Sequence, residues 1–132
     1  MTLFVDASAL VAIVQNEDDA DILTQRLAAD PDRVTSALAL WEAARAIRRD
    51  RTSEVDETMG ELERFCRGFG MRVVTIGIAE ATGAMHAQAR YGKGTGHPAR
   101  LNMGDCFAYA CAKTNTAKLL YKGDDFVHTD LA

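Results

Sequence analysis

The stretch TLFVDASAL, residues 2–10, sets the fold, because it joins a strand to a helix through a single acidic residue. Residues 2–5 are β-rich and apolar, which is typical of a short strand buried on both faces. The pattern of residues 7–14 predicts a short apolar helix, which Asp6 or Ser8 can cap. A strand buried on both faces belongs to a parallel sheet covered by helices, so the start of the chain predicts an α/β protein.

The rest of the chain continues this alternation. The loop GKGTGHP at residues 92–98 contains three glycines and a proline, which break regular structure. Strands joined by helices form a parallel sheet with both faces covered, and ligands of such sheets bind at the carboxyl ends of the strands. Further helices are predicted at residues 18–29, 36–49, 54–68, 78–91 and 104–114, and further strands at 33–35, 72–76 and 118–121.

Length and composition are those of an ordinary globular protein. The 132 residues fit one domain, 1–132, which is long enough to bury a core without disulfides or a structural metal. The net charge of −4 argues against a broad basic surface for non-specific duplex binding.

The three cysteines have no CxxC spacing, so no zinc framework is expected, and Cys106 and Cys111 are predicted to be buried as small apolar residues. No apolar run has the length of a membrane span, and no signal-peptide pattern opens the chain. We therefore expect a cytoplasmic location without a membrane partner.

Acidic residues are the main indication of function. Three of the four acidic positions lie in apolar surroundings, which carboxylates avoid unless something offsets their desolvation. Oxygen ligands suit Mg²⁺ or Mn²⁺, so a group of carboxylates favours a divalent cation site. The positions are Asp6, Glu42, Asp105 and the pair Asp124-Asp125.

A two-metal phosphodiester hydrolase would use these acids directly. Such sites hold two ions about 4 Å apart, one activating water and the other stabilising the leaving oxygen. Asp6 and Asp105 would be metal ligands, and Asp105 lies near a helix N-terminus that favours its charge. Glu42 shares a helix face with Arg45 and Arg49, so it could bind metal or orient water while the arginines hold backbone phosphate.

Each of these signals also has a purely structural interpretation. Asp6 could be a helix cap, and Asp124-Asp125 a solvated turn. Glu42 with Arg45 and Arg49 could form surface ion pairs worth about 0.3–0.5 kcal/mol. The basic patch of Arg45, Arg48, Arg49 and Arg51 fits single-stranded RNA but equally a solvated helix end.

Other motifs are less informative. His97 could touch RNA phosphate, but we expect it to shape its loop. His86 and His128 lack metal-ligand spacing, and neither a P-loop nor GxGxxG is present. An apolar stripe is either core or a groove for a partner helix; it comprises Ala20, Leu23, Leu27, Leu38 and Trp41.

Four segments, spread in order along essentially the whole chain, together resemble the sequence pattern of a known protein family. They are VDASAL at 5–10, Ser36-Ala37 through Trp41-Glu42-Ala43, HPARLNMGDCFAYA at 97–110 and LLYKGDDF at 119–126. The chain resembles PIN-domain ribonucleases, specifically VapC-type toxins of type II toxin–antitoxin systems. The stretch from Leu101 to Ala110 is the most specific part of this similarity.

The resemblance implies a three-layer α/β/α fold with a central parallel sheet of four to five strands, and an Mg²⁺- or Mn²⁺-dependent endoribonuclease. Its metal ligands would correspond to Asp6 and Asp105, with Glu42 as a further acid. Many PIN domains carry Asp-x-Asp-Phe where this chain has Gly123-Asp124-Asp125-Phe126; Asp125 is the preferred fourth acid and Asp124 the alternative.

The resemblance also implies roles around this acidic site. Ser8 would support the metal site by a hydrogen bond, and the products would carry 5′-phosphate and 3′-hydroxyl groups. A homodimer bound by a cognate antitoxin is implied too, the antitoxin placing a segment in the acidic pocket where an Arg could replace a metal.

Three alternatives remain. A receiver-like signalling domain would need two adjacent acids after the first strand and an Asp after the third, and this chain has neither. A phosphatase with an Asp-x-Asp nucleophile is disfavoured because Ser8 occupies the second position. A catalytically silent PIN-like binding module stays open because Gly123 departs from the family pattern.

Overall fold

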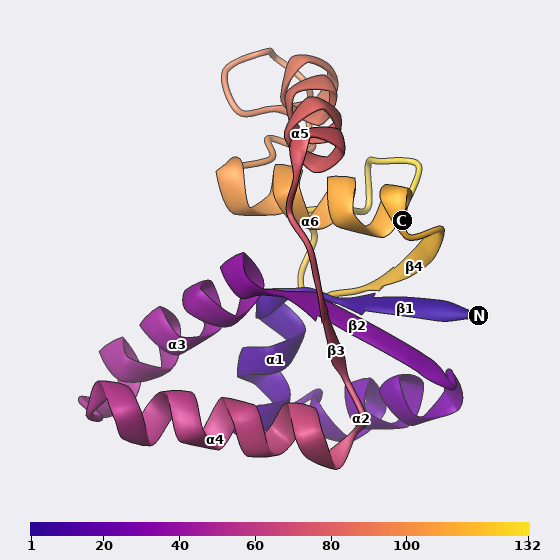
Figure 1. Ribbon diagram of the computed structural model, residues 1–132. Coiled ribbons are helices and arrows are strands. Elements are labelled where there is room, and N and C mark those ends of the chain that lie inside the picture. Colours follow the sequence, from indigo (N-terminus) through magenta and orange to yellow (C-terminus); the bar gives the residue numbers. More distant parts are fainter.

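A four-stranded parallel sheet lies between two layers of helices in the computed structural model, which describes residues 1–132 (Figure 1). The strand order is β3-β2-β1-β4, and every neighbouring pair is parallel. The predicted three-layer α/β/α architecture is therefore confirmed, with four strands. In chain order the elements are β1 (Thr2–Val5), α1 (Ala7–Val14), α2 (Ala20–Ala29), β2 (Asp32–Ser36), α3 (Ala37–Arg51), α4 (Val55–Gly68), β3 (Arg72–Val74), α5 (Ile78–Tyr91), α6 (Met103–Thr114) and β4 (Ala117–Leu120).

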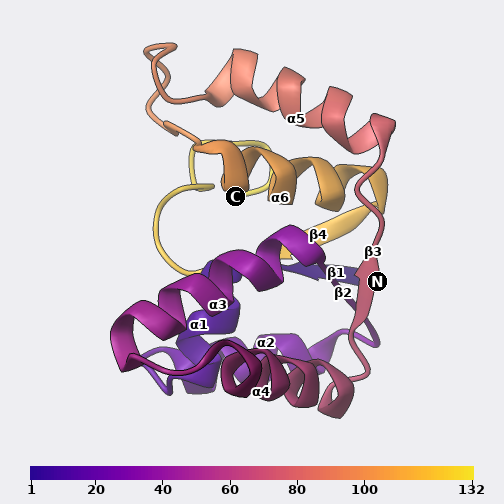
Figure 2. The same cartoon turned by 60° about the vertical axis from the view of Figure 1, so that its left-hand side comes forward.

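The two faces of the sheet bury separate cores. Successive strand residues point to opposite faces, so Phe4 enters one core while Leu3 and Val5 enter the other. One core lies under α5 and α6, and the other lies among α1 to α4 (Figures 1 and 2). Both views place α5 and α6 on one side of the sheet and the first four helices on the other.

The apolar stripe predicted across two helices is divided between the core and the surface. Ala20, Leu23 and Leu27 of α2 are buried core residues. Trp41 of α3 is 57% exposed, so the stripe predicted to join it to α2 is split between core and surface. The cysteines Cys66, Cys106 and Cys111 are all free and buried, as expected for small apolar side chains. None of the helices has the length and apolarity needed to cross a bilayer.

Element boundaries differ from the predictions by a few residues, for local reasons. The helix expected from residue 18 begins at Ala20, because the Ala20 amide turns back to donate to the Glu17 carbonyl. The strand expected over 72–76 ends at Val74, whose partner Ser36 is the last residue of β2 and caps α3. Since β3 pairs only with β2, its hydrogen-bonded ladder stops there.

Parallel pairing places the carboxyl ends of β1 and β4 side by side. Val5 is in register with Leu120, and the Asp6 amide donates to the Leu120 carbonyl at 2.9 Å. The chain segments that leave the two strands, at Asp6 and at Tyr121, therefore start from neighbouring points on one edge of the sheet.

Candidate metal-dependent active site

Asp6 is held at the end of β1 by the helix that follows it. Its carboxylate caps α1 by accepting the Ser8 amide at 3.0 Å and the Ser8 hydroxyl at 2.6 Å, both at Oδ2. Burial raises the pKa of Asp6, and the nearby Asp125 charge adds to this effect although the Ser8 bonds oppose it. Capping thus occupies one carboxylate oxygen and leaves Oδ1 for another partner.

Ser8 joins Asp6 to the segment after β4. Its hydroxyl donates to Asp6 and also accepts the Lys122 amide at 3.0 Å. The Lys122 ammonium forms ion pairs with Glu17 at 2.6 Å and Asp19 at 3.4 Å. These contacts fix the start of the turn that carries Asp124 and Asp125.

Asp105 occupies the first turn of α6 in a capping box. The Asn102 side-chain oxygen accepts the Asp105 amide at 2.8 Å, while Asp105 Oδ2 accepts the Asn102 amide at 3.1 Å. Asp105 is only 8% exposed. Burial raises its pKa to about 7 against the effect of the Asn102 bond, and the charges of Asp125, Asp6 and Glu42 raise it further.

Glu42 projects from α3 toward the same edge of the sheet. It is half-buried, accepts no hydrogen bond and joins no ion pair. Burial raises its pKa to about 7, the Asp6 charge contributes in the same direction, and Arg45 opposes both. The predicted alternative of a Glu42–Arg45–Arg49 ion-pair network is wrong, because Arg45 lies over the Trp41 ring and Arg49 pairs with Asp50.

The two adjacent acids of the turn after β4 differ in their electrostatic effect on the rest of the site. Both are exposed and line one hollow of about 380 Å³ with Asp105. Only Asp125 contributes to the raised pKa values of Asp6 and Asp105. Phe126, which is 1% exposed, anchors the chain directly after Asp125 and packs on Tyr121 at a ring distance of 5.1 Å.

The acids form an electrostatic group, and the chemistry of its donors fits a hard divalent cation. Carboxylate oxygens are the ligands that Mg²⁺ and Mn²⁺ prefer, and none of these acids has an ion-pair partner to offset the mutual repulsion. As they stand, no three side chains among His, Cys, Asp and Glu converge closely enough to enclose an ion. Binding a metal would require the exposed acid of the turn or the Glu42 side chain to move.

Several polar residues around the hollow were missed from the sequence alone. The basic side chains lie on the loop after α5 and on the segment after β4, and they surround the acids without pairing to them. His128 follows Asp124 and Asp125 closely in a segment of consecutive turns, so its proximity to them depends on how those turns fold. The residues concerned are Lys93, Arg100, Asn102 and His128.

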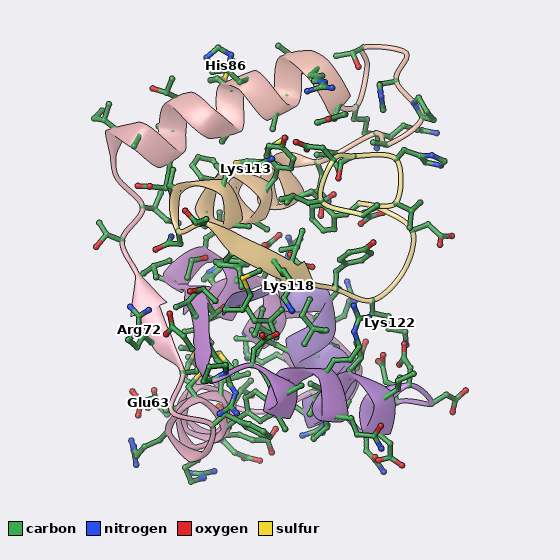
Figure 3. The ribbon with its side chains drawn as sticks, turned by 90° about the vertical axis from the view of Figure 1, so that its right-hand side faces the viewer. Glu63, Arg72, His86, Lys113, Lys118 and Lys122 are labelled. Atoms are coloured by element: carbon green, nitrogen blue, oxygen red, sulfur yellow. The ribbon has the colours of Figure 1, made fainter.

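The remaining histidines lie outside the acidic group. His97 Nδ1 accepts the Ala99 amide at 3.1 Å, and its ring packs edge-on against Tyr91 at 4.9 Å, so it shapes its loop as predicted. His86 is exposed on the outer side of α5 (Figure 3). Neither histidine affects the pKa values of Asp105 and Glu42.

The arginines of α3 lie one to two turns beyond Glu42. Arg45, Arg48 and Arg49 line a shallow hollow of about 350 Å³ with Thr52, Ser53 and Glu54. Arg48 is partly engaged, because its Nε donates to the Ser53 carbonyl at 3.0 Å. The structure therefore places cationic side chains on the helix that carries Glu42.

Comparison with known proteins gives matches over almost the entire chain. The family model for the PIN domain matches residues 3–131. A VapC ribonuclease of Rhizobium meliloti is 41% identical over 97% of this chain and 98% of its own length. Ribonuclease VapC of Mycolicibacterium smegmatis is 40% identical over 98% of each chain, and Ribonuclease VapC42 of Mycobacterium tuberculosis 37% identical over 98% and 96%.

One solved structure shares the fold. The crystal structure of Mycobacterium tuberculosis VapC20, described as a sarcin-ricin loop cleaving toxin, superposes with a TM-score of 0.73. The match covers 95% of this chain and 92% of that one, at 17% sequence identity. At that identity the likeness concerns the fold alone.

Proposed function

The chain belongs to the PIN-domain family and within it resembles the VapC ribonucleases, and from that premise we propose that it is the toxin of a type II toxin–antitoxin system, a single-domain endoribonuclease that hydrolyses RNA phosphodiester bonds. The observation that carries the proposal is the group of four carboxylates without ion-pair partners, from Asp6, Glu42, Asp105 and Asp125, at the carboxyl edge of the sheet. RNA in the cytoplasm would be its substrate.

We propose Mg²⁺ or Mn²⁺ as the cofactor, held by Asp6 and Asp105 through the oxygens that capping leaves free. Asp125, rather than Asp124, would complete the set of ligands, because its charge raises the pKa values of both Asp6 and Asp105. When bound, the cation would supply positive charge that stabilises the phosphate in the transition state. Ser8 would keep Asp6 in place through its 2.6 Å hydrogen bond.

Glu42 is the best-placed residue to handle a proton. Its carboxylate has no hydrogen-bond partner, and the burial that raises its pKa makes it a better proton acceptor for an attacking water than an exposed Glu. Attack by water would leave a 5′-phosphate and a 3′-hydroxyl. Arg45 and Arg49 would hold flanking RNA phosphates as charged hydrogen-bond donors.

Cleavage of a panel of structured RNAs by the purified, antitoxin-free protein tests this proposal. We expect discrete cuts with Mg²⁺ or Mn²⁺ that disappear with chelator, and a loss of about 100-fold or more in Asp6→Asn and Asp105→Asn. Asp32→Asn is the matched control, since Asp32 lies at the opposite end of the sheet and pairs with Arg72. Equal cleavage by all variants would indicate a contaminating nuclease, and folded protein without cleavage or metal binding would favour the silent binding module.

The cognate antitoxin is proposed to cover an apolar surface between α3 and α4. Trp41, Val55 and Met59 are exposed there around a small hollow, and Arg45 and Arg48 border it. An apolar surface with cationic edges fits a partner segment that carries apolar and acidic side chains. Trp41 is the single tryptophan of the chain, so its emission should shift to the blue when the antitoxin binds; an unchanged spectrum in a formed complex would place the antitoxin elsewhere.

We propose a homodimer as well, formed through the outer surface of α5 and the start of α6. Met85 and Met103 are exposed there, at 65% and 67%, and line an apolar hollow of about 510 Å³. Light scattering of the antitoxin-free protein would measure its mass, and Met85→Lys should reduce a dimer to monomers. A monomeric wild type would refute this part of the proposal.

A further inference from the structure

Gly104 is the residue of α6 that lies closest to Glu42 of α3. A Cβ atom added at Gly104 would stand 2.5 Å from the Glu42 carboxylate carbon and 2.6 Å from Oε1, and closer still to Oε2. These separations are far below any real Cβ contact. The Gly104 backbone has no positive φ, so its conformation is open to other residues. The Glu42 carboxylate therefore occupies the space that a side chain at position 104 would fill.

Glu42 has no other attachment that would hold its carboxylate in place. It accepts no hydrogen bond, and its neighbour Arg45 lies over the Trp41 ring with its guanidinium carbon 5.6 Å from the ring centre. The amides of Met103 and Gly104, at the start of α6, have no hydrogen-bond partner. A helix N-terminus with free amides attracts negative charge, so the carboxylate is favoured against this turn.

The same helical turn carries Asp105, the next residue. Its carboxylate is fixed by the capping box with Asn102, and its electrostatics include the charge of Glu42. The first turn of α6 thus affects two acids. It fixes Asp105 by hydrogen bonds, and at Gly104 it leaves room for the Glu42 carboxylate.

We propose that Gly104 is a positioning residue for the acidic site, whose missing side chain lets the Glu42 carboxylate of α3 sit against the first turn of α6 beside Asp105. This inference rests on the proposed nuclease function, which gives the Glu42 carboxylate a task. Any side chain at this position displaces the carboxylate and leaves Asp6, Asp105 and Asp125 in place.

The fold should tolerate such a change. The atoms that obstruct a new Cβ belong to the end of a flexible, half-buried side chain, which can rotate away. Alanine is also a better helix former than glycine. Gly104→Ala is therefore expected to keep or raise the midpoint of thermal unfolding while it damages the site, a combination that general misfolding would not produce.

Gly104→Ala and a matched control, Gly68→Ala, test the proposal. Gly68 also lies in a helix, and nothing lies within 4 Å of a Cβ placed there. For Gly104→Ala we expect RNA cleavage to fall about 10- to 100-fold, because the proton acceptor is displaced, while Mn²⁺ affinity, measured by calorimetry, stays within about twofold of the wild type, because Asp6, Asp105 and Asp125 are unmoved. Gly68→Ala should match the wild type in both measurements.

A double-mutant cycle with Glu42→Ala shows whether Gly104 acts through Glu42. Once Glu42 is removed, Gly104→Ala should cause no further loss of cleavage. An equal loss in both backgrounds, or a lower unfolding midpoint for Gly104→Ala alone, would overturn the proposal.

The carboxyl ¹³C shift of Glu42, measured by NMR on metal-free protein, decides the matter independently of activity. A changed shift in Gly104→Ala with an unchanged shift in Gly68→Ala supports the positioning role. An unchanged shift in both refutes it, even if the wild type cleaves RNA. A wild type that neither cleaves nor binds Mn²⁺ would refute the nuclease function while this shift still reports where Glu42 lies.

Discussion

The two ends of the sheet differ in whether their acidic side chains form ion pairs. At the amino ends of the strands, Asp32 binds the Arg72 guanidinium at 2.8 Å and Asp30 binds the Lys118 ammonium at 3.1 Å. At the carboxyl ends, Asp6, Glu42 and Asp105 lie near one another and form no ion pair. The chain thus supplies cations for the acids that flank the amino ends of the strands, and none for Asp6, Glu42 and Asp105.

This difference appears in the ionisation of the acids. Hydrogen bonds from Arg72 and Thr2 lower the pKa of Asp32, whereas burial and mutual repulsion raise the pKa values of Glu42 and Asp105 to about 7. Acids paired with cations contribute to folding, while acids kept close without them cost stability and are typical of functional sites. We propose on this comparison that the carboxyl end of the sheet performs the chemistry and that the amino end is structural.

The largest loss of cleavage is expected within the turn after β4, where Asp124 and Asp125 are adjacent but only Asp125 affects the ionisation of Asp6 and Asp105. Asp125→Asn should reduce RNA cleavage about 100-fold, because it removes a charge that acts on both Asp6 and Asp105. Asp124→Asn should reduce it only a few-fold. Initial rates at saturating Mn²⁺ would measure both, with calorimetry to follow Mn²⁺ affinity.

Asp125→Asn and Asp124→Asn serve as controls for each other, since both remove one exposed negative charge from the same hollow. A larger loss in Asp124→Asn would show that the turn rearranges when metal binds and that Asp124 is the fourth acid. Equal small losses would restrict the functional acids to Asp6, Glu42 and Asp105.

The pH dependence of stability should separate the two ends of the sheet. Well below pH 4, Glu42 and Asp105 are protonated in folded and unfolded states alike. Between about pH 4 and 7 the unfolded chain ionises them while the folded protein keeps the protons, so the free energy of unfolding falls as pH rises. The lowered pKa of Asp32 acts oppositely, and its contribution is lost only in acid.

Thermal unfolding of metal-free protein between about pH 5 and pH 8 would measure this effect. The midpoint should decrease across the range, and Asp105→Asn or Glu42→Gln should flatten the decrease while abolishing or weakening cleavage. Mn²⁺ should raise the midpoint at pH 8, because it binds the folded state. A midpoint that rises with pH in the wild type would contradict the raised pKa values.

A smaller effect is expected at Ser8, which connects Asp6 to the segment after β4. Ser8→Ala removes the hydroxyl that donates to Asp6 and accepts the Lys122 amide, but Asp6 keeps the Ser8 amide at 3.0 Å. Cleavage should fall about tenfold, in the range seen for residues that orient metal ligands, and stability by about 1 kcal/mol. Ser8→Thr retains the hydroxyl and should retain most activity; equal losses in both variants would mean that the side chain acts by size.

The fold could be predicted because local patterns and global topology agree. Residues 2–5 and 7–14 form the strand and helix that their composition indicated, and α5 spans the predicted 78–91. Boundaries that depend on tertiary partners were missed, as at β3, which ends where β2 can no longer pair with it. The number of strands also depends on such pairings.

The candidate site was predictable in its residues and less so in its geometry. Positions after strands, such as Asp6, could be assigned to one edge from topology alone. The positions of Glu42 and Trp41 depend on how α3 packs against α6 and α4, which no local pattern contains. The close approach of the Glu42 carboxylate to Gly104 has the same origin, because the two residues lie far apart in sequence.

The smallest effect is expected at the amino end of the sheet, where Arg72 lies on β3 (Figure 3). Arg72→Ala breaks its exposed ion pair with Asp32, and because both side chains are solvated the free energy of unfolding should fall by no more than about 1 kcal/mol. Asp32 still accepts the Thr2 hydroxyl at 2.8 Å, so its carboxylate stays in place. Cleavage and Mn²⁺ affinity should equal those of the wild type. In denaturant unfolding, Arg72→Lys keeps the charge, so its free energy of unfolding should lie between those of the wild type and Arg72→Ala. Loss of cleavage in Arg72→Ala would mean that the paired acids at this end influence the unpaired acids at the other through the strands, and the contrast between a structural and a functional end would fail.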